Sequence, residues 1–535
     1  MTVAATTGVA IVRILVADPI ANDGVERLRA AGEVVVATGL SLEELKVRIA
    51  DVDALVVRSE TKVTAEVFEA APRLRVVGRA GVGVDNIDLE AATRHGVLVL
   101  NAPTGNTIAA AEHTIGMMLA MARNISRADA SMHAGRWDRK AFMGTELREK
   151  TLGLLGLGKI GFEVARIASQ GLKMRVIADD PLVTAERAEQ AGAELVDFET
   201  LLAQSDFLTV HVPLNDKTRG VIGAAELARM KKGARLINVA RGGIIDEQAL
   251  ADAVREGHIG GAAIDVFTKE PILPENPLLS VPELVLTPHL GASTTEAQVN
   301  VATDVADQIV QYLGGVGPRY AVNLPSIQPE EMARLQPYLI LAEKMGSLAA
   351  QLAGEKVSRV VCSYAGELSK VEPSPLTAEV LRGLFSHFTD TRVNAINAKL
   401  VAKDHGVAVE ERTTTRDLDH ADALLVEVIG GTRLTLVGTQ FEGQPRITRI
   451  DDFRVDMDPT GLFLVVQHND RPGVVAKVSG LLASNDINIA GIELGRDRPR
   501  GRAVMLIQVD DPVGPELQLA LQAVADLESL RVVTL

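Results

Sequence analysis

Three side chains between residues 238 and 293 have the types that the oxidation of an alcohol requires. Arg241 closes the run Asn238–Arg241, Glu270 stands before a proline, and His289 stands after one. A histidine can accept the hydroxyl proton because its pKa lies near neutrality. A carboxylate on the other ring nitrogen fixes the tautomer, and an arginine binds a carboxylate or polarises a forming carbonyl. Each is singly more often a surface or capping residue, so the three are convincing only together.

A glycine-rich motif precedes them, Gly156-Leu-Gly158-Lys-Ile-Gly161, between a strand-like run and a helical pattern. Its glycines allow a tight turn, a close approach to a pyrophosphate and helix–strand packing. The next strand ends in Asp179-Asp180-Pro181, where such motifs carry an acid. An acid there accepts bonds from the ribose hydroxyls and repels the extra phosphate of NADP, so we expect NAD. We choose Asp180 because a proline follows it; a structural turn with chance glycines is the less favoured alternative.

Strands that alternate with helices must position these residues, because this alternation predicts parallel sheets with ligand groups at the carboxyl ends of strands. The first series of predicted strands is Arg13–Asp18, Glu33–Thr38, Ala54–Arg58, Leu74–Gly78 and Val97–Leu100. The second series is Thr151–Leu155, Met174–Ala178, Phe207–Val210, Arg235–Asn238, Gly261–Asp265 and Leu284–Thr287.

Helical patterns set the expected domain limits. A mostly apolar helix, Thr107–Ala130, should lie between domains or subunits, and a helix at Thr294–Leu313 should return to the first domain. We therefore expect an α/β protein with two Rossmann-like or flavodoxin-like parallel-sheet domains that form a crevice. An α+β region and a small ferredoxin-like module, with a strand, a helix, strands and a final helix, should follow. The expected limits are 11–107 with 295–318, 108–294, 319–457 and 461–535.

Composition excludes several classes of protein. The chain has 535 residues, of which 47% are hydrophobic and 23% charged, as in a folded protein of several domains. A net charge of -15 and 3% aromatic residues disfavour nucleic-acid binding. The single cysteine, Cys362, excludes disulfide and cysteine-based metal frameworks, and we expect no metal. No apolar run suits a membrane span, and Met1–Val12 do not resemble a secretory signal, so a cytoplasmic location is expected.

The motifs together resemble the D-isomer-specific 2-hydroxyacid dehydrogenases, over residues from about 13 to 318. The resemblance rests on Gly156–Gly161, Asn238–Gly243, Asp265–Pro271 and Thr287–Ser293. It implies that Arg241, Glu270 and His289 are catalytic. It also implies that His211–Pro213 line the adenine side, Val239 and Ala240 approach the nicotinamide ribose, and Asp265 bonds the nicotinamide carboxamide. The full implied NAD site is Gly156, Gly158, Lys159, Ile160, Gly161, Asp180, His211, Val212, Pro213, Val239, Ala240, Asp265, Gly291 and Ala292.

The expected substrate carries a doubly charged anionic group such as a phosphate. Arg58, Ser59, Arg79 and Asn106 lie in predicted loops that face the crevice, and two arginines with amide and hydroxyl donors suit a phosphate. Surface arginines are the alternative. Resemblance to the phosphoglycerate dehydrogenases implies D-3-phosphoglycerate as substrate, oxidised to 3-phosphohydroxypyruvate in the first step of L-serine biosynthesis. It further implies that Arg139, or alternatively Lys140, reaches the substrate phosphate of a partner subunit. Arg241 is also counted among the substrate-binding residues, through the carboxylate or the forming carbonyl.

The C-terminal module resembles an ACT domain through Val465–Ala476 and Asp486–Ala490. This implies feedback inhibition by L-serine between modules of neighbouring subunits in a homo-oligomer, with a tetramer expected. The candidate effector residues are His468, Asp470, Gly473 and Asn488, although some relatives carry Asn where this chain has Asp470. Residues 319–457 resemble an intervening allosteric domain that can bind anions or substrate. Arg446, Arg449 and Arg454 are its candidates, but solvated surface arginines are the preferred interpretation.

Two other functions stay open at this point. The enzyme could act on an unphosphorylated hydroxy acid such as glycerate or lactate, and reduction of 2-oxoglutarate is a possible second activity. An NAD(H)-sensing, corepressor-like binding protein is the alternative from another class. The ACT-like module disfavours it because such a module indicates metabolic feedback.

Overall fold

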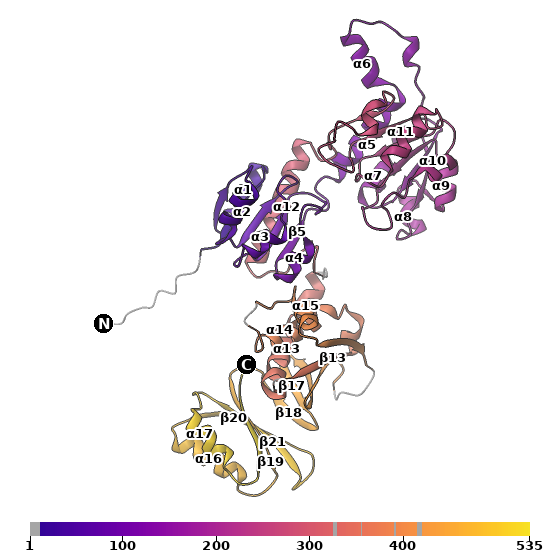
Figure 1. Ribbon diagram of the computed structural model, residues 1–535. Helices are drawn as coiled ribbons and strands as arrows, with labels where there is room; N and C mark the ends of the chain where they lie inside the picture. The colour runs from indigo at the N-terminus through magenta and orange to yellow at the C-terminus, as the bar shows by residue number, and fades with distance from the viewer. Residues whose placement is uncertain (1–10, 325–328, 355, 390–391, 415–419) are drawn as a thin grey trace.

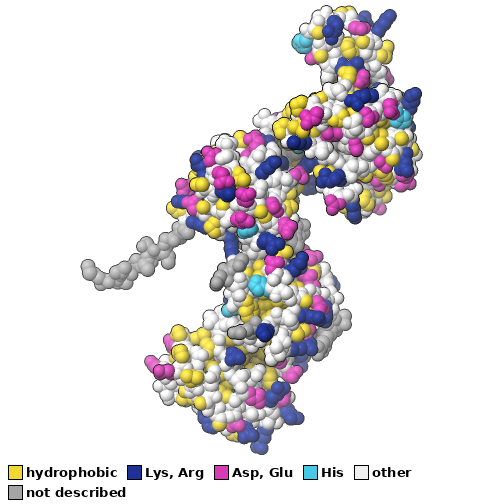
Figure 2. All heavy atoms as spheres, viewed as in Figure 1, with side chains coloured by type: hydrophobic (Ala, Val, Ile, Leu, Met, Phe, Trp, Pro, Cys, Tyr) yellow, Lys and Arg dark blue, Asp and Glu magenta, His cyan; other side chains and the backbone are white. Residues whose placement is uncertain are grey.

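The computed structural model describes residues 11–324, 329–354, 356–389, 392–414 and 420–535. The segment Met1–Val12, which was compared with secretory signals, lies almost wholly outside the described residues. The described chain forms four sheets with their covering helices. In Figure 1 the N-terminal sheet lies between the second sheet and the third, and the C-terminal sheet lies beyond the third. Figure 2 shows basic and acidic side chains interspersed over the visible face. No helix among the described residues is long and apolar enough to cross a membrane.

The first sheet is parallel, in the order β2-β1-β3-β4-β5. Its strands are β1 (Arg13–Val16), β2 (Glu33–Val36), β3 (Ala54–Val57), β4 (Val76–Arg79) and β5 (Leu98–Asn101). Its helices are α1 (Asn22–Leu28), α2 (Leu42–Ile49), α3 (Ala65–Glu69) and α4 (Leu89–Arg94). The helix expected at 294–313 is α12 (Thr295–Leu313), and its Val301, Val305 and Ile309 share a core with this sheet.

The second sheet is also parallel, in the order β12-β11-β10-β9-β6-β7-β8. Its strands are β6 (Thr151–Leu155), β7 (Arg175–Asp179), β8 (Glu194–Leu195), β9 (Phe207–Val210), β10 (Arg235–Asn238), β11 (Gly261–Ile264) and β12 (Val285–Leu286). Its helices include α7 (Lys159–Arg166), α8 (Ala185–Gln190), α9 (Phe198–Gln204), α10 (Ala224–Arg229) and α11 (Glu247–Arg255). The chain reverses its direction of travel across the sheet between β6 and β9, which is where ligands bind in such sheets.

The single helix predicted at Thr107–Ala130 is wrong. The structure has α5 (Thr107–Ala122) and α6 (Ile125–His133), separated by Asn124 in the left-handed conformation, with φ of 53°. Asparagine tolerates this conformation better than most residues, so it can end a helix abruptly. α5 packs in the core of the second sheet, whereas α6 projects away from it (Figure 1).

The third sheet is mixed, in the order β14-β13-β15-β16-β17-β18. Its strands are β13 (Val357–Ala365), β14 (Ala408–Thr413), β15 (Ala423–Gly430), β16 (Arg433–Phe441), β17 (Gln444–Ile450) and β18 (Phe453–Met457). β14 is a parallel edge strand, and the other neighbours run antiparallel. The helices α13 (Pro329–Ala353), α14 (Ser374–Phe385) and α15 (Ala398–Asp404) accompany it.

The fourth sheet is antiparallel, in the order β20-β21-β19-β22. Its elements are β19 (Leu462–Asn469), α16 (Val474–Ser484), β20 (Ile489–Arg496), β21 (Arg502–Val509), α17 (Pro515–Gln522) and β22 (Leu527–Thr534). The predicted final helix is therefore followed by a strand, which the sequence analysis missed. Asp526 adopts a left-handed φ of 75° after α17, and Leu530 and Val533 are then buried in the sheet.

The third and fourth sheets share one hydrophobic core. Phe463, Val504 and Val533 of the fourth sheet belong to the same buried cluster as α13 and the third sheet. The side chain of Gln351 on α13 also binds the backbone of Thr534 in both directions, at 2.9 and 3.0 Å. The fourth sheet therefore packs against α16 and α17 on one face and against α13 and β18 on the other.

Candidate active site

Three adjacent parallel strands, β10, β11 and β12, end at the same edge of the second sheet. Arg241 follows β10, Glu270 follows β11 and His289 follows β12. Because the carboxyl ends of neighbouring parallel strands face one side, the three loops converge, as the sequence predicted.

His289 and Glu270 are hydrogen-bonded. Nδ1 of His289 lies 2.7 Å from Oε2 of Glu270, and the backbone N–H of Phe267 donates to Oε1 at 2.9 Å. Burial alone would raise the pKa of Glu270, but the bonds from His289 and Phe267 hold it below its usual range. The carboxylate stays ionised and accepts from Nδ1, which leaves Nε2 of the half-exposed imidazole for proton transfer.

Asp265 is fully buried beside this pair. Oδ1 accepts hydrogen bonds from the Thr287 hydroxyl at 2.6 Å, the Leu290 N–H at 2.7 Å and Nε2 of His113 at 3.2 Å. Oδ2 accepts from the Gly291 N–H at 2.9 Å. The protein's own donors thus occupy most of this carboxylate, and its contact with the nicotinamide carboxamide stays a prediction.

The sequence analysis missed His113. This histidine lies on α5 and is 152 residues away from Asp265 in sequence. In the sequence, His113 stands out only as a histidine within a mostly apolar helix. The helical pattern alone does not show which residue, distant in sequence, this imidazole contacts.

Three arginines, two from the strand ends of the first sheet and one from the second, lie near one another. Arg79 ends β4, and the positive charges of Arg241 and Arg58 act on it electrostatically. Burial, reinforced by those charges, lowers the pKa of Arg79 to about 10, so its guanidinium remains cationic at neutral pH. Among the described residues its buried Nε has no hydrogen-bond partner. An orphaned buried donor on a cation suits an anionic ligand.

Arg241 crosses to the first sheet's loops. Its Nε lies 3.1 Å from Oδ2 of Asp85, and one terminal nitrogen donates to the Ala240 carbonyl at 2.7 Å. A Cβ atom on Gly83 would lie only 1.9 Å from the other terminal nitrogen. The glycine therefore makes room for the guanidinium between the two sheets.

The remaining predicted substrate residues are placed differently. The backbone N–H of Arg58 donates to the buried carboxylate of Asp18 at 2.6 Å, which fixes the loop after β3, and Ser59 is exposed beside it. Asn106 precedes α5, and its buried Oδ1 has no partner among the described residues. The chain does not bring Arg139 to this cluster, because it lies exposed beyond α6 with Lys140.

The glycine motif has the shape of a dinucleotide loop. Gly156 has φ of 96°, and a Cβ there would lie 2.8 Å from the His211 carbonyl. A Cβ on Gly161 would lie 2.3 Å from the Gly156 carbonyl, whereas one on Gly158 would meet no atom within 4 Å. The loop is therefore tight where it turns and open where a pyrophosphate would approach, at the start of α7. These residues fit NAD.

Asp180 points back to this loop. Its carboxylate accepts from the Leu157 N–H at 2.8 Å and from the Leu182 N–H at 2.9 Å. This places a carboxylate beside the glycines, as ribose binding requires. By contrast, burial raises the pKa of Asp179. The geometry thus favours the choice of Asp180.

The other predicted cofactor residues surround the same edge. His211 follows β9, its backbone N–H binds the Leu155 carbonyl at 2.7 Å, and burial lowers its pKa to about 4. A Cβ on Gly291 would lie 3.0 Å from Val239, which places the loops after β10 and β12 in contact. The rest lie on these loops or on α7: Lys159, Ile160, Val212, Pro213, Ala240 and Ala292.

Only three of the four candidate effector residues lie near one another within the chain. His468 is buried on β19, Asp470 follows that strand, and Gly473, with φ of 92°, precedes α16. The Arg500 N–H, together with Arg496, lowers the pKa of Asp470. Asn488 lies beyond the other end of α16, where it donates to Asp510 at 2.5 Å.

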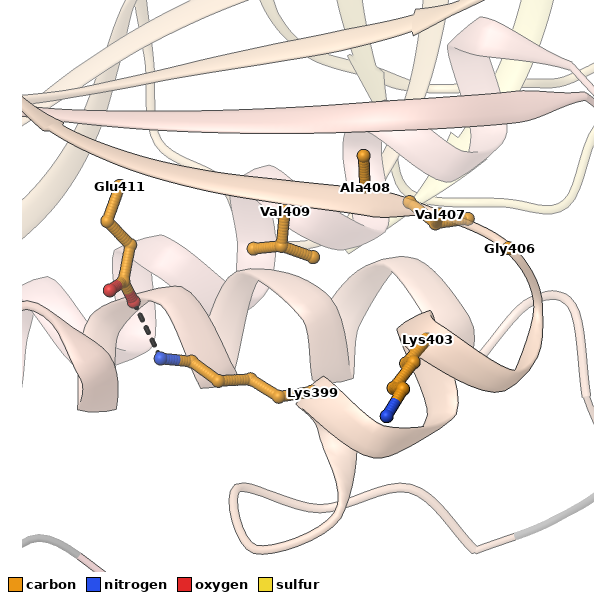
Figure 3. A pocket seen from close by; sticks show the side chains of 7 residues that line it. All are labelled: Lys399, Lys403, Gly406, Val407, Ala408, Val409 and Glu411. Carbon is orange, nitrogen blue, oxygen red and sulfur yellow. Dashed lines mark hydrogen bonds and ion pairs between the residues drawn. The ribbon is translucent and has the colours of Figure 1, made fainter.

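Two other features of the third sheet lie apart from the crevice. A hollow of about 440 Å³ separates α15 from β14, and in it Lys399 donates to Glu411 at 2.8 Å (Figure 3). Lys403 also lines this hollow. Of the arginines considered for an allosteric site, Arg446 pairs with Asp458 at 3.0 Å, and Arg449 and Arg454 face each other across β17 and β18.

Known protein families match three parts of the chain. Residues 115–291 match the NAD binding domain of D-isomer specific 2-hydroxyacid dehydrogenases. Residues 334–451 match the D-3-phosphoglycerate dehydrogenase intervening domain, and residues 463–526 match the ACT domain.

Individual relatives and solved structures are also similar to this chain. A D-3-phosphoglycerate dehydrogenase of Archaeoglobus fulgidus is 47% identical over 510 residues, which cover 94% of this chain and 96% of that one. Among solved structures, a glyoxylate reductase from Paecilomyes thermophila is 30% identical with a TM-score of 0.54, and covers 58% of this chain and 98% of its own. An NAD-dependent formate dehydrogenase from Staphylococcus aureus in complex with NAD is 27% identical with a TM-score of 0.52, and covers 57% and 96%.

Proposed function

The chain belongs to the D-3-phosphoglycerate dehydrogenase family, and on that premise we propose which of its residues carry out the reaction. It is an NAD-dependent oxidoreductase of serine biosynthesis that converts D-3-phosphoglycerate to 3-phosphohydroxypyruvate. The single observation that carries the assignment of residues is the hydrogen-bonded pair of His289 and Glu270 beside a cluster of three arginines.

His289 is the general base in this proposal. Its Nε2 takes the proton of the C2 hydroxyl, and Glu270 holds Nδ1 and stabilises the imidazolium that forms. Arg241 binds the substrate carboxylate and steadies charge on the C2 oxygen. NAD, when bound, supplies the hydride acceptor. The loop Gly156–Gly161 would hold its pyrophosphate and Asp180 its ribose.

The substrate phosphate is assigned to the first sheet's loops. Arg58, Arg79, Ser59 and Asn106 supply cationic, hydroxyl and amide donors, and the unpartnered Nε of Arg79 supports this assignment. Arg139 would act on the phosphate in a partner subunit, which agrees with its exposed place outside the crevice.

The domain limits and the regulation are parts of the same proposal. The substrate-binding domain comprises 11–107 with 295–318, followed by an NAD-binding domain at 108–294, an intervening domain at 319–457 and an ACT domain at 461–535.

L-serine would bind between ACT domains of two chains, with His468, Asp470 and Gly473 from one and Asn488 from the other. A cytoplasmic homotetramer is proposed, since a shared effector site requires an oligomer. Reduction of 2-oxoglutarate stays a prediction.

The test compares D-3-phosphoglycerate with D-glycerate by the absorbance of NADH. We expect turnover of the phosphorylated substrate by the unmodified chain and a loss of about 100-fold or more in kcat for His289→Gln. No loss is expected for His420→Gln, at a residue of the bend that precedes β15. Equal kcat/KM for both substrates would contradict the phosphate assignment. Full activity of His289→Gln would contradict the assignment of the base.

A further inference from the structure

His289 is held in a backbone conformation that most residues avoid. Its φ is 56°, in the left-handed region, where a Cβ atom crowds the backbone. Such a conformation persists only where the surrounding contacts enforce it. The position of the imidazole therefore depends on whatever holds this short loop after β12.

One buried residue supplies that hold. The Asp265 carbonyl accepts the His289 N–H at 2.8 Å, and its carboxylate accepts the N–H groups of the next two residues, Leu290 at 2.7 Å and Gly291 at 2.9 Å. Three consecutive backbone N–H groups thus end on Asp265. Any rotation of this carboxylate would move the loop that carries His289.

The carboxylate is in turn fixed by two side chains. The Thr287 hydroxyl donates to Oδ1 at 2.6 Å and belongs to the same loop, so it cannot anchor Asp265 independently. Nε2 of His113, at 3.2 Å from Oδ1, comes from α5, an element outside the loop. The Asp265 side chain is wholly inaccessible to solvent, so a hydrogen bond from a ring that can carry charge offsets the loss of water.

We propose that His113 is a positioning residue for the dehydrogenase reaction: through Asp265 it orients the loop 287–291 and keeps His289 aligned with Glu270. The proposal rests on the proposed function, because it assumes that His289 is the base. The His113 side chain is 23% exposed, so its contribution through packing must be separated from its contribution through the hydrogen bond. α5 also reaches the same network through Met117, whose sulfur lies 3.4 Å from the Thr287 hydroxyl.

The test is a pair of substitutions in the full chain. His113→Leu keeps the apolar bulk but cannot donate, whereas His113→Gln can place an amide N–H near the position of Nε2. We expect His113→Leu to lower kcat about tenfold, with KM for D-3-phosphoglycerate and the thermal unfolding midpoint little changed. His113→Gln should recover at least half of the lost kcat on a logarithmic scale.

Two results would overturn the proposal. Equal losses in the leucine and glutamine variants would mean that only the shape of the ring matters. A loss confined to KM would mean that His113 serves substrate binding and not the alignment of His289. If the His113→Leu variant does not fold, His113→Asn replaces it, because the shorter asparagine amide does not reach Asp265. The same tenfold loss of kcat with little change in KM is then expected for His113→Asn. His289→Gln is measured in parallel: if it retains full activity the proposed base is wrong, whatever His113 does.

Discussion

The Nε atom of Arg241 lies 3.1 Å from Oδ2 of Asp85, so a residue of the second sheet's edge is paired with a loop of the first sheet. The pair is partly exposed, with 28% and 69% of the two side chains accessible, and exposed ion pairs contribute about 1 kcal/mol or less. In the proposed role of Arg241, a substrate carboxylate would have to share or take over this guanidinium. Asp85 would then compete with the substrate for Arg241.

Asp85→Asn should lower KM for D-3-phosphoglycerate about two- to threefold, because it removes the competing charge and keeps the shape. The value of kcat should change little. Steady-state kinetics at low salt provide the measurement, and the effect should shrink as salt screens the charges. A higher KM would instead show that Asp85 orients Arg241 for the substrate.

Glu270→Gln should lower kcat by about 100-fold or more, because the neutral amide cannot stabilise the imidazolium of His289. KM should stay within a few-fold.

The pKa of Glu270 is lowered in the folded chain. The ionised Glu270 therefore contributes to folding stability above the usual carboxyl range, and this contribution is lost as pH falls through the lower folded pKa. Glu275→Gln, an exposed change nearby, is the matched control and should behave as the unmodified chain.

Arg79→Ala and Arg58→Ala should each raise KM for D-3-phosphoglycerate by about 10-fold or more and affect D-glycerate much less. Removal of Arg79 should not destabilise the chain, because its buried Nε has no partner among the described residues. Arg48→Ala, on an exposed face of α2, is the control. An equal effect on both substrates would assign these arginines to the carboxylate or to folding.

His211 should make folding stability depend on pH. Burial lowers its pKa from 6.5 to about 4. Between these values the unfolded chain binds the proton and the folded chain does not, so stability is full above pH 6.5 and declines as pH falls toward 4. The slope is at most about 1.4 kcal/mol per pH unit. Urea midpoints across this range should fall more steeply for the unmodified chain than for His211→Gln, and parallel curves would refute this.

Asn488→Ala should abolish inhibition by L-serine, because we assign its amide to the effector. The reaction rate without serine is the internal reference. Asn485→Ala is the control, since that side chain binds only the Leu481 carbonyl of α16, at 2.8 Å, among the contacts described. Inhibition unchanged by Asn488→Ala would remove this residue from the effector site.

The convergence of the three proposed catalytic residues could be predicted because parallel strands align their carboxyl ends. Once strands were placed before Arg241, Glu270 and His289, only one edge of one sheet could receive all three. The same reasoning cannot find His113, because the rotation of α5 about its axis is set by packing against the second sheet. Nor did it separate α5 from α6, since the left-handed Asn124 interrupts a run whose composition is helical throughout.

The ACT-like sheet was predicted without its last strand because a helix and a half-buried strand compete for the same few apolar residues. Leu530 and Val533 become strand residues only when β19 is available as a neighbour. Asp470 and Asn488 were taken as one site, yet α16 stands between them in the folded chain. The length of α16 sets the distance between these two residues within one chain. They can belong to one effector site only if a second chain supplies one of them.

The core shared by the third and fourth sheets also limits how this protein can be re-engineered. Transplanting residues 461–535 alone into another dehydrogenase would leave Phe463, Val504 and Val533 facing water and would strip α13 of its cover. A chimaera meant to inherit the proposed serine response should exchange everything from α13 to residue 535 as a single segment. The same shared core would be exposed if natural recombination separated the two sheets.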